Sequence, residues 1–366
     1  MCIRYILWFI LVAACFTVLT AAQNPIRKRH LIPVRILLVA VKTILCLLAA
    51  NLVMIQNIGY MFWVCYFLAA CYVALFGDTV GDMISLLIVI FGKQGSYARP
   101  QIIVCAVCTL TYLVYGTVNM QVVTAKPFTM HSEKLRENYR IAFVADLHVG
   151  SAQSLATTEK TIRKIEAETP DLVLLGGDIV DEYTTKEEML WVFSQFGAMD
   201  VPVYYIYGNH DRQDMHELTG GALFTPEELE DSLKTNGIRI LRDEWLRFSD
   251  DLVIFGREDI SHPERLTIGE IPVRPEDAFV LLLDHSPYQT EEIELSHVDL
   301  QLSGHSHAGQ LFPLQIFYNL MGYDACGEYH HGETVLYVSS GASGWCIPFR
   351  TEEVCRYEMI MLAPEA

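Results

Sequence analysis

Acidic side chains are almost missing from the first third of this 366-residue chain. Up to Val123 there are eight basic residues and only two acidic ones, Asp78 and Asp82. A water-soluble domain needs a charged surface, so this scarcity, combined with long apolar runs, excludes an ordinary soluble domain here and indicates a membrane region. The remaining residues include 18 basic and 42 acidic side chains, which indicates an acidic soluble domain.

Positive charge is correspondingly scarce in the second part of the chain. A domain with such an excess of carboxylates repels polyanions, because its field opposes their approach. We therefore expect no nucleic acid among its partners.

Cysteine is also scarce there, since only Cys326, Cys346 and Cys355 lie beyond residue 108. They have neither C-x-x-C nor zinc-knuckle spacing, which excludes a disulfide framework and leaves at most one bridge open. None of them has the setting of a nucleophile paired with a base. A water molecule is therefore the expected nucleophile of any hydrolysis.

The apolar runs predict about four transmembrane helices within a membrane region at 1–120. A shorter run, 83–91, has nine apolar residues and cannot cross roughly 30 Å of hydrocarbon at about 1.5 Å per residue. It predicts an interfacial or re-entrant segment, with 79–92 as a fifth span as the alternative. The first run also resembles a cleaved signal peptide, so its fate stays open. The four predicted spans cover 5–22, 36–55, 60–76 and 101–119.

Charge between the runs predicts the orientation of the chain in the cell membrane. With four spans, the loops that carry Arg27 to Arg29 and Lys93 with Arg99 both face the cytoplasm, as the positive-inside rule favours. The domain at 121–366 then lies on the extracytoplasmic side. Val122, Val123 and Phe128 predict its opening strand, and Pro127 predicts that this strand lies at an edge.

Five segments of the second part share one pattern, a short apolar strand that runs into an acid, an amide or an imidazole. A helix is predicted over 158–168, between the first two segments. In a doubly wound α/β pattern the ends of such strands meet along one rim, where these folds build their sites. The segments are 140–148, 172–178, 203–211, 279–285 and 298–307.

The side chains at these ends suit metal chemistry. Strand alternation directs Asp146 and His148 the same way, and His305 and His307 lie on the turn where another strand ends. Asp178 has two oxygens that can bridge two cations, although Asp181 is an alternative ligand.

Two further ends offer an amide and more imidazoles. Asn209 supplies a neutral oxygen, and His285 ends the fourth strand. His210 can donate a proton to a leaving oxygen if Asp211 or another acid holds its ring.

Together these residues resemble the calcineurin-like metallophosphoesterase superfamily over about residues 120–362. Its blocks D-x-H, G-D-x-x-D, G-N-H-D/E, H and G-H-x-H stand here as 146–148, 177–181, 208–211, 285 and 304–307. The resemblance implies a four-layer α/β/β/α sandwich and hydrolysis by a metal-bridged hydroxide. It also implies two divalent metal ions, Mn, Zn or Fe, with Mn favoured.

Carried over residue by residue, the resemblance assigns a role to each motif. His210 is the general acid or oxyanion stabiliser, and Asp211 orients it. One metal takes Asp146, His148, Asp178 and His307, and the other takes Asp178, Asn209, His285 and His305.

Within the superfamily, the closing segments 337–341 and 348–350 and the N-terminal spans resemble the membrane-associated YkuE- and YaeI-like phosphodiesterase branch. Ala145, Ser306 and Ala308 depart from that branch without removing a ligand, which leaves substrate preference open. Arg350 is either a phosphate or rim contact or the partner of an acid.

The apolar segment 311–323 either lines the rim and faces the bilayer, admitting a phosphorylated or pyrophosphate-linked lipid, or packs in the core. The predicted function is a membrane-anchored phosphodiesterase or pyrophosphatase. The alternatives are a phosphoprotein phosphatase and a non-catalytic sensor of a phosphorylated ligand.

Overall fold

The computed structural model describes residues 36, 37, 40, 61–91, 98–215, 221–267, 270, 277–289 and 298–365. The chain forms two compact units, one comprising Met1–Val118 with Leu311–Leu314 and the other Asn119–Gln310 with Gln315–Ala366. The predicted spans at 5–22 and 36–55 lie outside the described residues, except for residues 36, 37 and 40 of the second, which are helical. Loops 27–29 and 93 also lie outside them.

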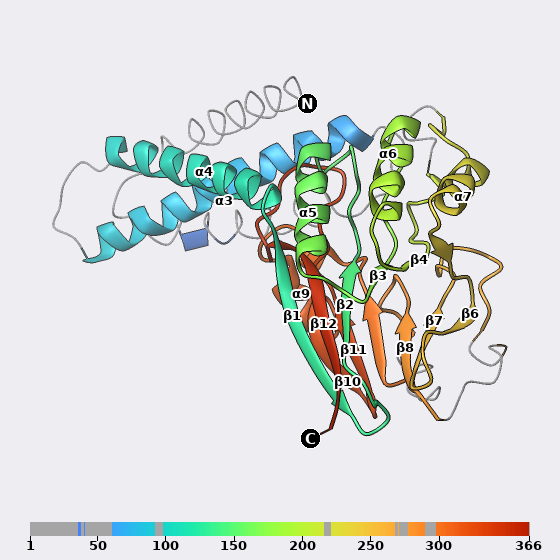
Figure 1. The fold of residues 1–366 in the computed structure, drawn as a ribbon. Helices are drawn as coiled ribbons and strands as arrows, with labels where there is room; N and C mark the ends of the chain where they lie inside the picture. The colour runs from blue at the N-terminus through green and yellow to red at the C-terminus, as the bar shows by residue number, and fades with distance from the viewer. Residues whose placement is uncertain are drawn as a thin grey trace. The chain divides into compact units, whose positions relative to one another are not determined.

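The first unit contains two long helices, α3 (Met61–Phe91) and α4 (Ala98–Met120) (Figure 1). Phe76 and Tyr112 stack between them with ring centroids 4.1 Å apart. Ile103, Val107 and Leu110 of α4 are exposed at helical spacing. Among the described residues, one stretch, Ile103–Met120, is both long and apolar enough to cross a membrane.

The predicted break between the third apolar run and 83–91 is wrong, because α3 is continuous over 31 residues. Asp78 and Asp82, which lie between the two apolar runs, are buried on this helix. Gly77 lets α4 approach closely, since a Cβ there would lie 2.1 Å from Thr109 Oγ1. Packing against α4 therefore accompanies the continuous helix, and a local sequence pattern does not show such a long-range contact.

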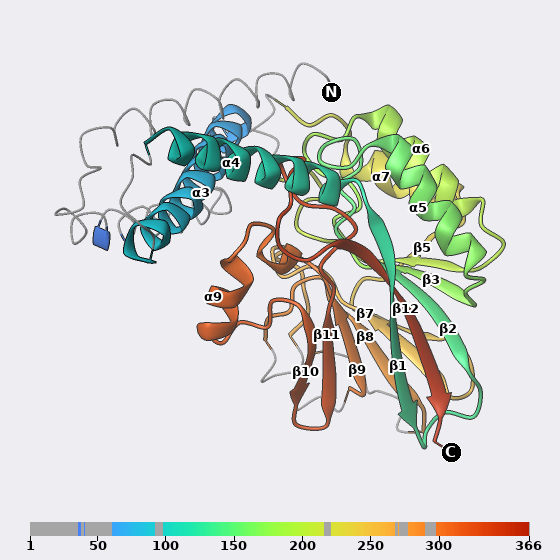
Figure 2. The ribbon, with the colours of Figure 1, turned by 90° about the vertical axis from the view of Figure 1, so that its left-hand side faces the viewer.

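The second unit contains two six-stranded mixed sheets (Figures 1 and 2). The first sheet has the order β1 (Val123–Ser132), β12 (Cys355–Pro364), β2 (Tyr139–Val144), β3 (Leu172–Leu175), β4 (Val203–Tyr205) and β5 (Arg239–Ile240). The second has the order β10 (Gly327–His331), β11 (Thr334–Val338), β9 (Leu300–Ser303), β8 (Phe279–Leu283), β7 (Leu252–Gly256) and β6 (Glu244–Arg247).

The opening strand is confirmed as β1. It pairs in parallel with β12 alone and is an edge strand, with Pro127 opposite Met359. Proline is tolerated there because it has no N–H to give to a second neighbour.

Three layers of the predicted sandwich are plain in the described residues. Helices α5 (Leu155–Ala167), α6 (Lys186–Gly197) and α7 (Pro226–Thr235) pack on the outer face of the first sheet (Figure 2). The second core lies between the two sheets and includes Phe143, Ile254 and Leu302. Over the outer face of the second sheet there is a smaller cluster, Phe255, Val280, Leu282 and Val298. The fourth layer stays a prediction.

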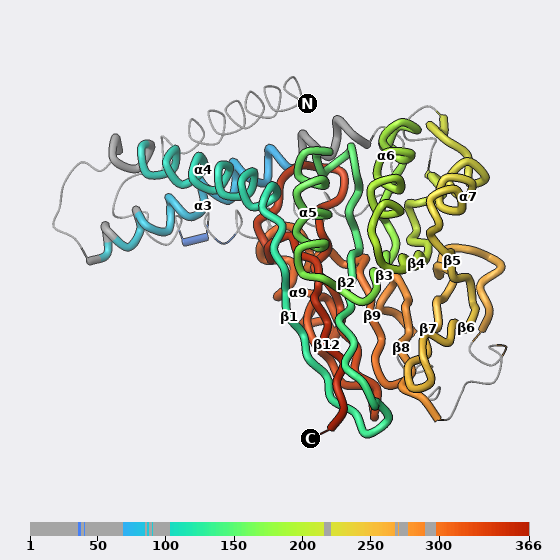
Figure 3. Tube along the Cα trace, viewed as in Figure 1, coloured from blue at the N-terminus to red at the C-terminus, as the bar shows by residue number. Residues whose placement is uncertain are grey.

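The single rim expected for the five strand ends is wrong in one respect. β2, β3 and β4 are parallel neighbours in the first sheet, whereas β8 and β9 are parallel neighbours in the second (Figure 3). Carboxyl ends of two facing sheets, and not of one sheet, therefore supply the predicted site residues. The alternation of apolar residues does not say which strands share a sheet, because both inner faces are apolar.

Candidate metal centre

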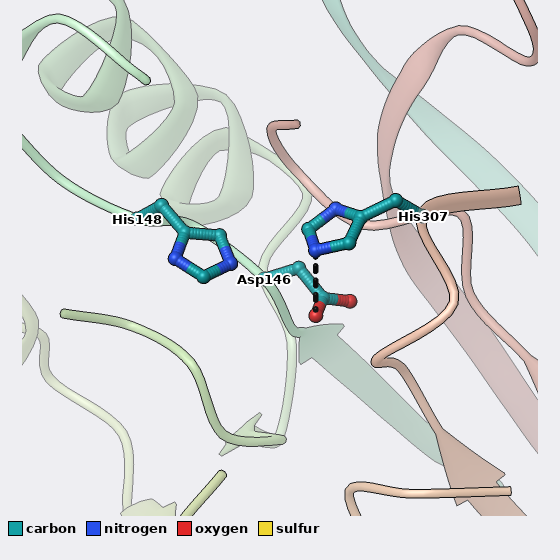
Figure 4. Close-up of side chains that lie close together, drawn as sticks. All are labelled: Asp146, His148 and His307. Atoms are coloured by element: carbon teal, nitrogen blue, oxygen red, sulfur yellow. Dashed lines mark ion pairs between the residues drawn. The ribbon is translucent and has the colours of Figure 1, made fainter. Parts of the chain in front are cut away.

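Two groups of predicted ligands lie close together at these strand ends. In one, ligand atoms of Asp146, His148 and His307 all lie within 4.8 Å of one another (Figure 4). The other joins Asp178, His285 and His305 by the same measure. The structure thus brings together side chains that are up to 161 residues apart in the numbering, from 146 to 307.

Asp178 lies between the two groups. Its Oδ2 is 3.0 Å from His285 Nε2 in its own group and 3.8 Å from His148 Nε2 in the other. Burial alone would raise the pKa of Asp178, but His285 and His210 hold it well below its usual range. The residue is therefore a carboxylate at neutral pH, positioned to serve two cations.

Asn209 lies beside the second group. Its Oδ1 is 2.8 Å from His305 Nδ1. Because an amide oxygen accepts hydrogen bonds and also binds divalent cations, this atom fits either a ring N–H or a metal.

Each of three imidazoles is held through Nδ1. The partner is Asp181 Oδ2 for His148, at 3.1 Å. It is a backbone carbonyl for His285 and for His307, that of Gly176 at 2.8 Å and that of Ser343 at 3.2 Å. Because these oxygens only accept, Nδ1 donates a hydrogen bond to them and Nε2 is the ring nitrogen left for a metal, as in metal-binding histidines.

The Nε2 atoms left in this way are what fits a metal. His148 Nε2 is buried without a hydrogen-bond partner, and His285 Nε2 lies 3.0 Å from the Asp178 carboxylate. Burial lowers the pKa of His305 to about 4 and that of His307 well below its usual value, so both rings are neutral at pH 7. Neutral imidazoles and carboxylates form a donor set that suits Mn, Fe or Zn.

The ligand loops are strained. Five of the predicted ligands have a left-handed backbone, a conformation that costs of order 1–3 kcal/mol and is tolerated mainly at functional sites. Gly304 permits the close approach of the last turn, since a Cβ there would lie 2.4 Å from Asp146 Oδ2. The φ angles are 54° at Asp146, 42° at His148, 53° at Asp178, 69° at His305 and 49° at His307.

His210 is held by an acid that the motifs do not include. Its Nδ1 lies 2.9 Å from both carboxylate oxygens of Glu182. Burial lowers the pKa of His210, but Glu182 and Asp178 more than offset this and raise it to about 10. The ring is thus an imidazolium, and within the described residues its Nε2 has no hydrogen-bond partner.

The prediction that Asp211 orients His210 is wrong. Its carboxylate accepts backbone N–H bonds from Gly208 and Asp178 at 2.7 and 2.8 Å, and from Ile179 and Val180 at 3.0 and 3.2 Å. Asp211 fastens the loops after β3 and β4 together, and no oxygen is left for the ring. Asp181, the alternative ligand, instead holds His148. Glu182 directly follows Asp181 in a loop, and no sequence signal distinguishes it from the other acids nearby.

Arg350 fulfils neither predicted role. Its guanidinium is buried and donates to backbone carbonyls of Ser343 at 2.7 Å, Ser340 at 2.7 Å and His307 at 2.9 Å. Its Nε donates to a fourth carbonyl, that of Glu353, at 2.5 Å. In the described residues it contacts no acid, so its role is to fix the turn that carries His307.

Residues 139–309 match the family model described as calcineurin-like phosphoesterase. This segment is thus similar to calcineurin-like phosphoesterases, and the chain is similar to proteins described as metallophosphoesterases, among them YkuE of Bacillus subtilis, with 27% identity over 58% of this chain and 75% of that one.

Other relatives extend this comparison. A Helicobacter pylori protein described as an uncharacterized metallophosphoesterase is 30% identical over 62% of this chain and 60% of its own length. A zebrafish (Danio rerio) protein described as a transmembrane protein with metallophosphoesterase domain is 28% identical over 68% of this chain and 60% of its own. The chain thus spans about 60% of the length of these two relatives.

Proposed function

We propose that this chain is a membrane-anchored phosphoesterase that depends on two divalent metal ions and hydrolyses a phosphodiester or pyrophosphate bond. The observation that carries the proposal is the position of Asp178, whose carboxylate lies 3.0 Å from His285 and 3.8 Å from His148, within reach of both ligand groups.

Each residue has a role in this proposal. Asp146, His148 and His307 hold one cation, Asn209, His285 and His305 hold the other, and Asp178 is shared. Two such cations, when bound, acidify a water molecule and neutralise charge on phosphate oxygens. The deep burial of two carboxylates and three imidazoles supports this assignment, because so many ionisable groups are rarely buried without a compensating ion. They are Asp146, Asp178, His148, His285 and His307.

The reaction needs a proton for the leaving group. Water oxygen forms a bond to phosphorus, the bond from phosphorus to the leaving oxygen breaks, and a water proton passes to solvent. His210 donates its Nε2 proton to the leaving oxygen, and Glu182 keeps the ring charged and oriented through Nδ1. Such proton transfer typically contributes about 10²- to 10⁴-fold to the rate.

The test is hydrolysis of bis-p-nitrophenyl phosphate by the full chain after loading with Mn, Zn or Fe. We expect Asp178→Asn to abolish turnover while the chain stays folded. We expect His210→Ala to reduce turnover strongly when diphenyl phosphate, whose leaving group has more need of a proton, is the substrate. Unchanged turnover in either variant contradicts the mechanism. Turnover confined to phosphopeptides would favour a protein phosphatase, and binding of phosphate without turnover of any ester would favour a sensor.

We further propose that the membrane region has about four spans and that the catalytic domain lies on the extracytoplasmic side of the cell membrane. The apolar stretch Ile103–Met120 and the names of two relatives, from zebrafish and cattle, support membrane anchoring. Protease added to intact cells lacking an outer wall should digest the domain. Digestion only after lysis would show that the domain lies on the cytoplasmic side and would contradict the proposed orientation.

The substrate is proposed to be lipid-linked. Helix α9 (Leu314–Leu320) and the residue after it expose Ile316, Leu320 and Met321 at 50, 77 and 59%. Core packing would have buried them, so this exposure favours contact with lipid. Leu320→Ser with Met321→Ser should slow hydrolysis of a lipid-linked diphosphate and leave bis-p-nitrophenyl phosphate unchanged, with exposed Asn319→Ser as the control. Equal rates on both substrates contradict the lipid assignment.

A further inference from the structure

We propose that Trp345 is a positioning residue for His210, an inference that rests on the proposed function of His210 as proton donor. The indole and imidazole rings are stacked, with centroids 5.1 Å apart and planes 24° apart. Trp345 is 3% exposed, so the contact is shielded from water.

The stack completes the enclosure of the His210 ring. Glu182 occupies Nδ1 at 2.9 Å, and His148 meets the ring edge-on with centroids 5.5 Å apart. Trp345 covers a face. Within the described residues only Nε2 is left without a partner, so the three neighbours fix the direction in which the proton is offered.

The stack also limits the motion of the ring. Trp345 covers its face while Glu182 holds its edge through Nδ1, so the ring is restrained from two directions. Without the indole, the ring would gain freedom to tilt and water would reach its face.

Trp345 itself is held by the turn that carries a predicted metal ligand. The buried carboxamide of Gln310 accepts from Trp345 N at 2.8 Å and donates to Trp345 O at 3.2 Å. The backbone N–H of Gln310 in turn donates to the carbonyl of His307 at 2.8 Å. Gln310, three residues after His307, thus connects the backbone of Trp345 to the turn that carries this predicted ligand.

A core-packing role alone does not account for tryptophan at this position. The indole Nε1 is buried without a hydrogen-bond partner, which costs free energy that phenylalanine would not incur. Packing therefore does not require an indole here. An aromatic face against His210 is what both tryptophan and phenylalanine provide, whereas leucine would fill space without providing it.

The experiment compares bis-p-nitrophenyl phosphate, whose leaving group needs little protonation, with diphenyl phosphate, whose leaving group needs more, using the Mn-loaded full chain. We expect Trp345→Leu to lower kcat for diphenyl phosphate about tenfold or more, as misplacement of a catalytic group can cost about 10²-fold. The nitrophenyl ester should change less than about threefold, with KM unchanged for both. Trp345→Phe should stay near wild type, and Trp191→Leu on α6 serves as the control for loss of an indole.

A double variant decides whether the two rings act together. If Trp345 acts through His210, Trp345→Leu should cause no further loss in a His210→Ala background. The inference is overturned if Trp345→Leu slows both esters equally, or slows the His210→Ala variant by the factor seen in wild type. If His210→Ala itself leaves both esters unaffected, the proposed role of His210 fails instead, and the inference falls with it.

Discussion

At the scale of single residues, two neighbouring acids do different work. Asp181 holds His148, a predicted metal ligand, whereas Glu182 holds His210. We predict that Asp181→Asn weakens metal binding about 10- to 100-fold, because such outer contacts orient the ligand. Glu182→Gln should bind metal normally and lose kcat. Metal titration and kinetics on both variants check this, and exchanged phenotypes would contradict the assignment.

Asp251, which is not among the predicted ligands, should make folding stability depend on pH. Burial would raise its pKa, but hydrogen bonds from Tyr139, Ser249 and the backbone N–H of Arg136 lower it to about 2. Because the folded pKa is below the unfolded value of about 3.9, its contribution is fully present above pH 5 and is lost as pH falls through 2. Asp251→Asn should therefore destabilise by about 2 kcal/mol at pH 7. The difference from wild type in thermal unfolding should shrink below pH 4, and a constant difference contradicts the account.

At the scale of elements, the turn after β9 must approach the loop after β2 closely. Gly304→Ala would place a Cβ 2.4 Å from Asp146 Oδ2 and 2.7 Å from Ala145 Cβ. We predict loss of metal from the group that contains Asp146, together with a lower melting temperature. Metal analysis of the purified variant, beside the wild-type protein, checks this. Retention of full metal content would contradict the predicted contact.

Elements also show what the sequence can and cannot predict. The strands that end at Asp146, Asp178 and His285 follow from short apolar runs, because strand burial is a local pattern. Partner choice is not local. The sequence pattern does not show whether Glu182 or Asp211 is the partner of His210. The loops after β3 and β4 decide this, because their backbone N–H groups donate to Asp211 and leave Glu182 for the ring.

The same limit applied to α3 and to the sheets. The apolar runs at 60–76 and 83–91 predicted separate segments, yet packing against α4 keeps the helix continuous. The assignment of β8 and β9 to a second sheet depended on long-range pairing, which apolar alternation does not specify.

At the scale of the whole molecule, the metal-free domain concentrates buried acids and imidazoles at one place. Cations that bind only the folded state stabilise it by mass action, by about 2.7 kcal/mol at a hundredfold excess over Kd. We predict that Mn raises the melting temperature of the chelator-treated chain by several degrees. Asp178→Asn should lose most of that shift, whereas Asp250→Asn, on an exposed turn, should keep it. An equal shift in both variants would contradict metal binding at Asp178.

The most direct test of the account is electron paramagnetic resonance of the Mn-loaded full chain. A carboxylate shared between two cations predicts about two Mn ions per chain with an exchange-coupled spectrum, and loss of that coupling in Asp178→Asn. A spectrum of isolated, uncoupled Mn in the wild-type protein would contradict the shared site.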